Sequence, residues 1–235
     1  MRKSFVMKIT FYGHACFGIE VGGKHLLFDP FITGNELAKD VDIESIPADY
    51  ILLSHGHEDH VLDAEVIAKR TGAKIVATFE IVTWYGAKGI DGHPMNIGGA
   101  WTFPFGKVKM VNAIHSSVLP DGTYGGNPGG FVVETAEGNF YYAGDTALTF
   151  DMKLIPMTSA PLDFAILPIG DNFTMGYDDA AIAADWVEAK NVIAGHYDTF
   201  GYIVVDKDEA RKAFAKRSQK LTFLNIGASI DVKDL

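Results

Sequence analysis

Apolar and polar residues alternate over short runs at the start of the chain, which is the pattern of half-buried β-strands. A Gly22-Gly23 pair separates two of these runs and indicates a hairpin turn, so the chain is expected to open with antiparallel strands. Residues 50–53 are apolar throughout and lead into Ser54-His55, as expected of a buried strand that delivers side chains to a site. The opening strands are predicted at residues 8–12, 16–21 and 25–28.

The rest of the chain alternates predicted strands with predicted helices. A strand at residues 74–77 lies between helical patterns near 64–71 and 81–88, which gives a β-α-β-α order. The second half again runs from β-rich to mixed α/β. We therefore predict an α/β fold, a four-layer αββα sandwich, in a single domain spanning residues 1–235. The later strands are predicted at 108–114, 130–134, 139–143, 164–167 and 192–194, and the later helices at 178–189 and 207–216.

Composition indicates a globular protein rather than a disordered or fibrous one. Hydrophobic residues make up 48% of the 235 and charged residues 21%, which is enough apolar material for a sizeable core. The formal net charge of −10 argues against a nucleic-acid partner, because such partners are bound by clustered Lys and Arg. A small-molecule substrate is therefore expected, and composition leaves a homo-oligomer open.

The expected compartment is the cytoplasm. Cys16 is the only cysteine, so no intramolecular disulfide can form and nothing indicates an oxidising compartment. The first seven residues are not followed by the apolar stretch of a signal peptide. No window approaches the roughly 20 apolar residues that span a bilayer, so no membrane contact is expected.

The main chemical signal follows the apolar strand at residues 50–53. His55, His57, Asp59 and His60 place four potential metal ligands within six residues. Alternate side chains of an extended segment share a face, and a turn can bring in the last histidine. Imidazole and carboxylate ligands suit zinc, manganese, iron or nickel. The competing interpretation is a polar surface loop, but packing alone rarely gathers three histidines and an aspartate.

This motif resembles the signature HxHxDH of the metallo-β-lactamase superfamily, which residues 55–60 match in full. The resemblance implies the metallo-β-lactamase fold and a metal-dependent hydrolase. Within the superfamily the chain is most similar to the small bacterial metal-dependent hydrolases related to ascorbate-6-phosphate lactonase (UPF0173-like). The segments that carry this similarity are GHACF at 13–17, LFDP at 27–30, YAGDT at 142–146 and LPIGD at 167–171.

The resemblance also implies a ligand set of five histidines and two aspartates for two divalent ions, zinc first, with manganese, iron or nickel as alternatives. Three ligands of the superfamily come from the ends of later strands, and His115, Asp145 and His196 occupy those places in order. Asp145 would bridge the two ions. The first ion would be held by His55, His57 and His115, and the second by Asp59, His60 and His196.

The predicted reaction is hydrolysis of a small ester, lactone or phosphoester by a hydroxide shared between the two metals. Asp59 would be a catalytic residue as well as a ligand, because its second oxygen could orient the hydroxide or accept its proton. Two alternatives stay open: a phosphodiesterase or nuclease, and a metal-binding sensor without turnover. The metals alone do not separate attack on carbon from attack on phosphorus.

Several residues outside the ligand set are candidates for secondary roles. His14 is predicted to contact the substrate or protonate a leaving group, with a local hydrogen-bonding role as the alternative. Asp29 is either a hydrogen-bonding partner of a ligand histidine or a turn aspartate. Asn172 and Thr174 could face the pocket, although helix capping by Asp178 explains part of that segment equally well.

Residues 119–130 are predicted to form a long loop, because they contain five glycines and two prolines. The segment closely follows His115, so it is expected to start at the rim of the metal site and to act as a lid. Tyr124 is its one large side chain and is therefore the second predicted substrate contact.

Overall fold

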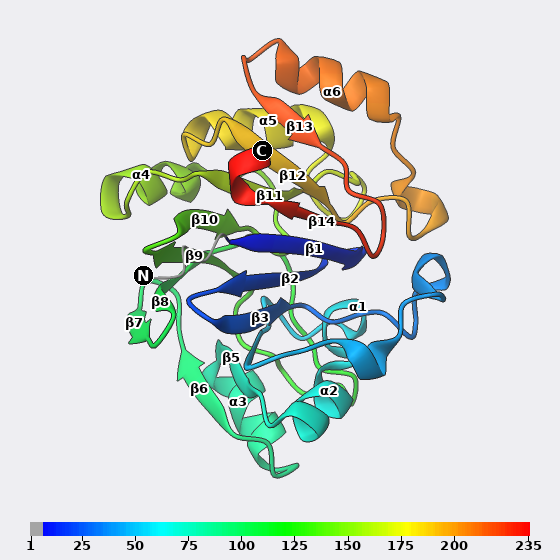
Figure 1. Cartoon of the computed structure of the whole chain (residues 1–235), viewed down its shortest axis with the longest axis vertical. Helices are drawn as coiled ribbons and strands as arrows, with labels where there is room; N and C mark the ends of the chain where they lie inside the picture. The colour runs from blue at the N-terminus through cyan, green and yellow to red at the C-terminus, as the bar shows by residue number, and fades with distance from the viewer. Residues whose placement is uncertain (1–6) are drawn as a thin grey trace, which may run out of the picture.

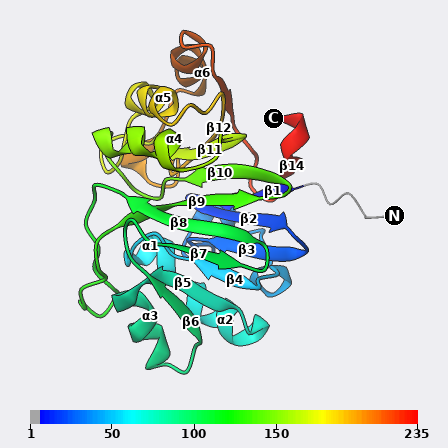
Figure 2. The same cartoon turned by 90° about the vertical axis from the view of Figure 1, so that its left-hand side faces the viewer.

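The computed structural model describes residues 7–235 and shows two seven-stranded sheets between two layers of helices (Figures 1 and 2). The first sheet, in spatial order, contains β14 (Ser229–Asp231), β1 (Lys8–Gly13), β2 (Cys16–Val21), β3 (Lys24–Phe28), β4 (Tyr50–Leu52), β5 (Lys74–Thr78) and β6 (Gly92–Met95). The second contains β13 (Lys220–Thr222), β12 (Asn191–Gly195), β11 (Phe164–Pro168), β10 (Gly138–Tyr142), β9 (Gly129–Thr135), β8 (Gly106–Asn112) and β7 (Ala100–Phe103).

Helices cover the outer face of each sheet, which confirms the four-layer αββα prediction (Figure 2). One layer contains α1 (Glu58–Val61), α2 (Ala64–Thr71) and α3 (Phe79–Gly86). The other contains α4 (Leu154–Thr158), α5 (Tyr177–Trp186) and α6 (Lys207–Ala215). No helix in the described part of the chain is long and apolar enough to cross a bilayer. The prediction about a signal peptide concerns mainly residues 1–6, which lie outside the described residues.

The strand pairing follows from the turns that join the strands. β1, β2 and β3 pair antiparallel, and both Gly22 and Gly23 have positive φ angles, 59° and 69°, as a tight two-residue hairpin turn requires. From β3 to β6 the pairing is parallel, because helices carry the chain back over one face. The predicted antiparallel opening and β-α-β-α order are both confirmed.

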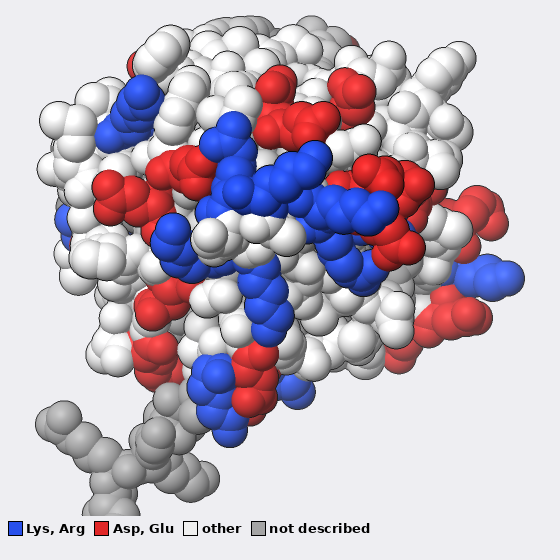
Figure 3. All heavy atoms as spheres, turned by 90° about the horizontal axis from the view of Figure 1, so that it is seen from above, with Lys and Arg blue, Asp and Glu red and all other residues white. Residues whose placement is uncertain are grey.

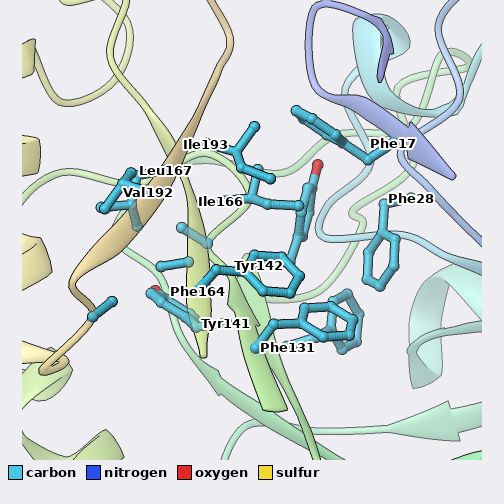
Figure 4. Packing of buried hydrophobic residues seen from close by; sticks show 14 of the residues in the cluster. Phe17, Phe28, Phe131, Tyr141, Tyr142, Phe164, Ile166, Leu167, Val192 and Ile193 are labelled. Atoms are coloured by element: carbon cyan, nitrogen blue, oxygen red, sulfur yellow. The ribbon is translucent and has the colours of Figure 1, made fainter. Parts of the chain in front are cut away.

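The core between the sheets is rich in aromatic residues (Figure 4). Phe28 from the first sheet packs against Tyr142 and Phe131 from the second, with ring centroids 4.7 and 6.3 Å apart. All three side chains are at most 1% exposed. Burying a side chain of this size stabilises the fold by about 1.5–3 kcal/mol, so these contacts hold the two sheets against each other. A second core of aliphatic residues lies under α2 and α3.

The structure also contains elements that the sequence pattern did not predict. These are β6, β7, β13, β14, α1 and α4, all of five residues or fewer. β14 pairs with β1 at the opposite end of the chain. Helix α5 begins at Tyr177 with Gly176 as its N-cap, and Asp178 makes no capping bond. The predicted capping role of Asp178 is therefore wrong, because the residue lies inside the first turn.

Candidate metal centre

Most of the predicted ligands lie at one edge of the sandwich, where parallel strands end, and His115 follows the antiparallel strand β8. β3 and β4 end beside one another in the first sheet, and β10 and β12 are both parallel neighbours of β11 in the second. His55 and His57 follow β4, Asp145 follows β10, and His196 follows β12. The chain turns into helix α1 after His57, so Asp59 lies on a helical turn rather than on the extended segment that the sequence predicted.

The first group of ligands contains His55, His57 and His115, whose nitrogen atoms lie within 4.8 Å of one another. The Nε2 atom of His55 is 3.0 Å from Nδ1 of His57. Ligand atoms of a tetrahedral ion with bonds of about 2.0 Å lie about 3.3 Å apart, so this spacing suits an ion bound between them. Gly56 allows the loop to pass here, because a Cβ atom would lie 3.2 Å from Leu119.

The second group contains Asp59, His60 and His196. The Oδ2 atom of Asp59 is 3.9 Å from Nε2 of His60 and 3.9 Å from Nε2 of His196. Asp145 lies between the two groups: its Oδ2 atom is 3.0 Å from His196 Nε2, 3.3 Å from His60 Nε2 and 3.6 Å from His115 Nε2. The structure thus brings the predicted ligands together in two groups that share one carboxylate.

His14 belongs to the second group as well, which the sequence did not predict. Its Nε2 atom is 3.1 Å from Asp59 Oδ2, and its Nδ1 atom is 2.9 Å from Thr199 Oγ1. The ring is 1% exposed and lies under Phe200, with centroids 5.3 Å apart. The geometry therefore does not support the predicted substrate contact, because the ring is covered. His14 instead forms a hydrogen bond to the Asp59 carboxylate from the buried side of the group.

Asp29 is the hydrogen-bonding partner of a ligand histidine, which decides between the two roles that the sequence left open. Its Oδ2 atom lies 2.8 Å from Nδ1 of His60 and also accepts hydrogen bonds from the Tyr142 and Ser54 hydroxyls, at 2.8 and 2.5 Å. Ser54 Oγ is in turn 2.9 Å from Nδ1 of His55. One buried carboxylate therefore orients two ligand rings and connects them to the aromatic core.

Burial and charge shift the histidine pKa values in opposite directions. Burial lowers the pKa of His55 well below its ordinary value, which keeps the ring neutral and able to bind a metal. Burial also lowers the pKa of His60, but the carboxylates of Asp145 and Asp59 outweigh it and raise the pKa well above the ordinary value. The position next to His60 Nε2 therefore attracts a cation.

The two carboxylates of the centre stay ionised. Burial raises the pKa of Asp145, but the neighbouring His196 and His60 reverse this effect and hold the pKa well below the ordinary range. Burial likewise raises the pKa of Asp59, and His60 and His14 outweigh it, so this pKa is lowered too. Ionised carboxylates are the form that binds metal ions.

Unpaired atoms in the centre fit a bound cation. His60 donates its Nδ1 hydrogen to Asp29, and its buried Nε2 atom makes no hydrogen bond in the structure. A metal ion that replaced the Nε2 proton would bind the lone pair of that atom. The buried Oδ1 atom of Asp145 makes no hydrogen bond either. Leaving such atoms unsatisfied is costly. Two groups of imidazole and carboxylate ligands around these atoms therefore fit divalent metal ions such as zinc.

Backbone strain is concentrated in the same place. His14, Asp29 and His196 each follow a strand, and their φ angles are 55°, 41° and 52°. Positive φ is uncommon outside glycine, and each such residue costs of the order of 1–3 kcal/mol. Strain of this size persists only where the surroundings impose it. The strand ends are therefore shaped to place these side chains rather than to relax the backbone.

A cavity of about 730 Å³ opens beside the ligands. Asp59, whose side chain is 27% exposed, lines it together with Asp145 and His196. The rest of the lining, apart from two further ligand histidines, comes from residues that the sequence analysis missed: Ser116, Phe173, Thr199, Phe200, Gly201 and Tyr202. The sequence contains one weak indication of them, because residues 199–202 begin three positions after the ligand His196.

The predicted lid segment, residues 119–130, does not line the cavity. Tyr124 does not line the cavity, and its hydroxyl donates to Asn127 within the same loop. The loop packs toward α3 instead: Trp84 Nε1 donates to Asp121 Oδ2 at 2.7 Å, and Thr78 Oγ1 donates to the Gly125 carbonyl at 2.8 Å. The loop also lies close to the ligand segment, because the Gly125 amide donates to the Ser117 carbonyl at 3.3 Å and the Gly56 amide donates to Ser117 Oγ at 3.1 Å. The Tyr124 side chain itself does not face the cavity, so the structure gives no support to the predicted substrate contact.

The two pocket candidates near residue 173 do not line the cavity either. Asn172 and Thr174 flank Phe173, which does line it. The Thr174 hydroxyl donates to the Met175 carbonyl and so is used locally. The prediction selected the right turn but the wrong side chains, because polar residues were favoured over the aromatic one.

Comparison with known proteins agrees with this geometry. The model of the beta-lactamase superfamily domain matches residues 8–196, so the chain belongs to this superfamily. That span contains the whole ligand set. The predicted superfamily and its metallo-β-lactamase fold are therefore confirmed.

More specifically, the relatives are UPF0173 metal-dependent hydrolases. One from Christiangramia forsetii is 60% identical over 227 residues, covering 96% of this chain and 100% of the relative. Another, YtkL of Bacillus subtilis, is 47% identical over 207 residues, covering 86% of this chain and 90% of the relative. The solved structure of Igni18, a metallo hydrolase from Ignicoccus hospitalis, has a TM-score of 0.87 at 31% identity and covers 96% of this chain and 98% of its own. The protein is a metal-dependent hydrolase.

Proposed function

We propose that the protein binds two divalent metal ions, zinc foremost, and hydrolyses a small ester, lactone or phosphoester. The observation that carries the proposal is the position of Asp145, whose Oδ2 atom lies within 3.6 Å of ligand nitrogens from both groups. A shared carboxylate of this kind serves two ions better than one. When bound, two such ions lower the pKa of a shared water and polarise a substrate oxygen.

The chain itself positions the reacting groups. Asp59 borders the cavity and is held through His14 by Thr199. Its lowered pKa keeps the carboxylate ionised, so it accepts a hydrogen bond from water well but binds a proton weakly. We therefore propose that Asp59 is first a ligand and an orienting group, and its role as general base stays a prediction. Asp29 and Ser54 fix the rings of the buried histidines.

The rival nuclease function has less support. Figure 3, which views the molecule from the α6 end, shows Lys and Arg side chains gathered across the middle of this face, with Asp and Glu side chains beside and around them. Lys212 lies 2.8 Å from Glu209, and Arg217 pairs with Asp185. Basic side chains that pair with neighbouring carboxylates in this way are less available to neutralise phosphate groups. We propose a small molecule as the partner rather than a nucleic acid.

The test is metal analysis combined with turnover. Elemental analysis of protein reconstituted with zinc, manganese or iron is expected to give up to two ions per chain. p-Nitrophenyl acetate is expected to be hydrolysed faster than bis-p-nitrophenyl phosphate, and a chelator should abolish the activity. No more than trace metal after reconstitution would contradict the two-ion site. Full metal loading without turnover of any ester would instead favour the alternative function, a metal-binding sensor that has no catalytic activity.

A further inference from the structure

The cavity beside the ligands has an aromatic wall. We use this name for Phe173, Phe200 and Tyr202, which line the cavity together with the ligands. Phe173 and Tyr202 are 49% and 78% exposed, although their rings meet edge to face at 6.1 Å. Large apolar side chains are rarely left this exposed side by side without a partner. The volume of about 730 Å³ is in the range of small-molecule pockets.

The wall is held in place before any substrate arrives. Phe173 lies in a turn closed by the Asp171 amide, which donates to the Met175 carbonyl at 3.1 Å. Phe200 and Tyr202 lie in a second turn, where the Asp198 amide donates to the Ile203 carbonyl at 2.8 Å. Backbone hydrogen bonds of this kind make both turns preorganised, so little ordering is needed on binding.

The cavity offers no cation from a side chain. Within residues 7–235, no Lys or Arg lines it. Lys207, which follows the second turn, is engaged elsewhere: its Nζ atom is 3.0 Å from Asp198 Oδ2 and lies over the Tyr197 ring. Proteins hold phosphate groups mainly with Arg and Lys. A phosphate away from the metal ions would therefore lose its hydration and gain no partner, and Asp59 would repel it.

We propose that the aromatic wall binds the non-reacting part of the substrate and that this part is uncharged and apolar. The substrate class is then an ester or lactone that carries an alkyl or aryl substituent, rather than a compound with a remote phosphate group. This inference rests on the proposed function, because it assigns the reacting bond to the metal centre. Each methylene buried on the wall is worth up to about fourfold in affinity or in kcat/KM.

The first experiment is an acyl-chain series of p-nitrophenyl esters, from acetate to hexanoate, with zinc-loaded protein. We expect kcat/KM to rise at least tenfold along the series, roughly the gain from a few buried methylenes. Phe173→Ala should remove most of this rise along the series and leave the metal content unchanged. Phe79→Ala is the matched control, because that ring is 60% exposed on α3 and does not line the cavity.

The second experiment needs no turnover. Acetohydroxamate and hexanohydroxamate share a metal-binding head, and their dissociation constants from zinc-loaded protein can be measured by calorimetry. We expect hexanohydroxamate to bind about tenfold more tightly than acetohydroxamate, and Phe173→Ala to lose this difference. That result would support substrate binding by the aromatic wall. Equal affinities, a flat ester series or tighter binding of a hydroxamate that ends in a phosphate group would overturn it. If no ester is hydrolysed, the proposed function fails, while the hydroxamate comparison still decides the inference.

Discussion

Replacing Asp29 by asparagine tests how the core holds the metal ligands. The carboxylate is fully buried, and its Oδ2 atom serves His60 and the hydroxyls of Tyr142 and Ser54, while Oδ1 accepts from the Ser54 amide at 2.8 Å. Asparagine keeps the shape but turns one acceptor into a donor. Its better orientation places the oxygen on the Oδ2 side, which leaves the NH₂ group facing the Ser54 amide.

The structure allows the magnitude to be worked out. Loss of an outer hydrogen-bonding partner of a metal-ligating histidine typically weakens metal binding 10- to 100-fold, or about 1.4–2.7 kcal/mol. Asp29 contacts His60 directly and His55 through Ser54, so we expect a loss near the upper limit. Metal-free protein should lose about 3 kcal/mol of unfolding free energy, because one buried donor is unpaired and the other bonds lose their charge.

Metal affinity is measured by competition with a chelator, and stability by urea unfolding of the metal-free protein. Asp63→Asn is the matched control: Asp63 is 2% exposed and accepts from the Ile32 amide and from the amide and hydroxyl of Thr33, none of which is a predicted ligand. The control should lose stability and keep its metal affinity. Unchanged affinity in folded Asp29→Asn, or an equal loss in the control, would refute the reasoning.

Three further predictions follow from the same geometry. Asp145→Ala should lose more bound metal, by elemental analysis, than His14→Ala, because Asp145 touches both ligand groups; equal losses would argue against a bridge. Burial and His196 lower the pKa of His14 to about 4, so between this value and the ordinary pKa of about 6.5 the unfolded state binds more protons. The stability from the neutral ring is complete above pH ~6.5 and lost as the pH falls toward 4. Urea unfolding of metal-free wild type should therefore show a loss about 3 kcal/mol larger than that of His14→Gln between about pH 7.5 and about pH 4, and parallel curves would contradict this. Tyr124→Ala should leave KM unchanged within about twofold on several esters, because the ring lies outside the cavity. A large change in KM would instead support the hypothesis that residues 119–130 act as a lid.

Local sequence determined much of this protein. The ligand motif lies within six consecutive residues, so its chemistry could be read without knowing how the chain folds. The buried parallel strands were equally clear, because strands such as β11 are buried at every position and must be apolar throughout. Gly22 and Gly23 predicted the hairpin for a similar reason: the turn needs positive φ, which glycine adopts without strain.

Only the tertiary structure decided how distant segments meet. β14 pairs with β1 across almost the whole chain, and such short strands carry too few residues for a periodic pattern. Asp29 could be a turn residue or a ligand partner until the fold placed His60 beside it. The aromatic wall and the covered ring of His14 escaped detection because burial depends on packing between loops, and sequence periodicity reports only on regular elements.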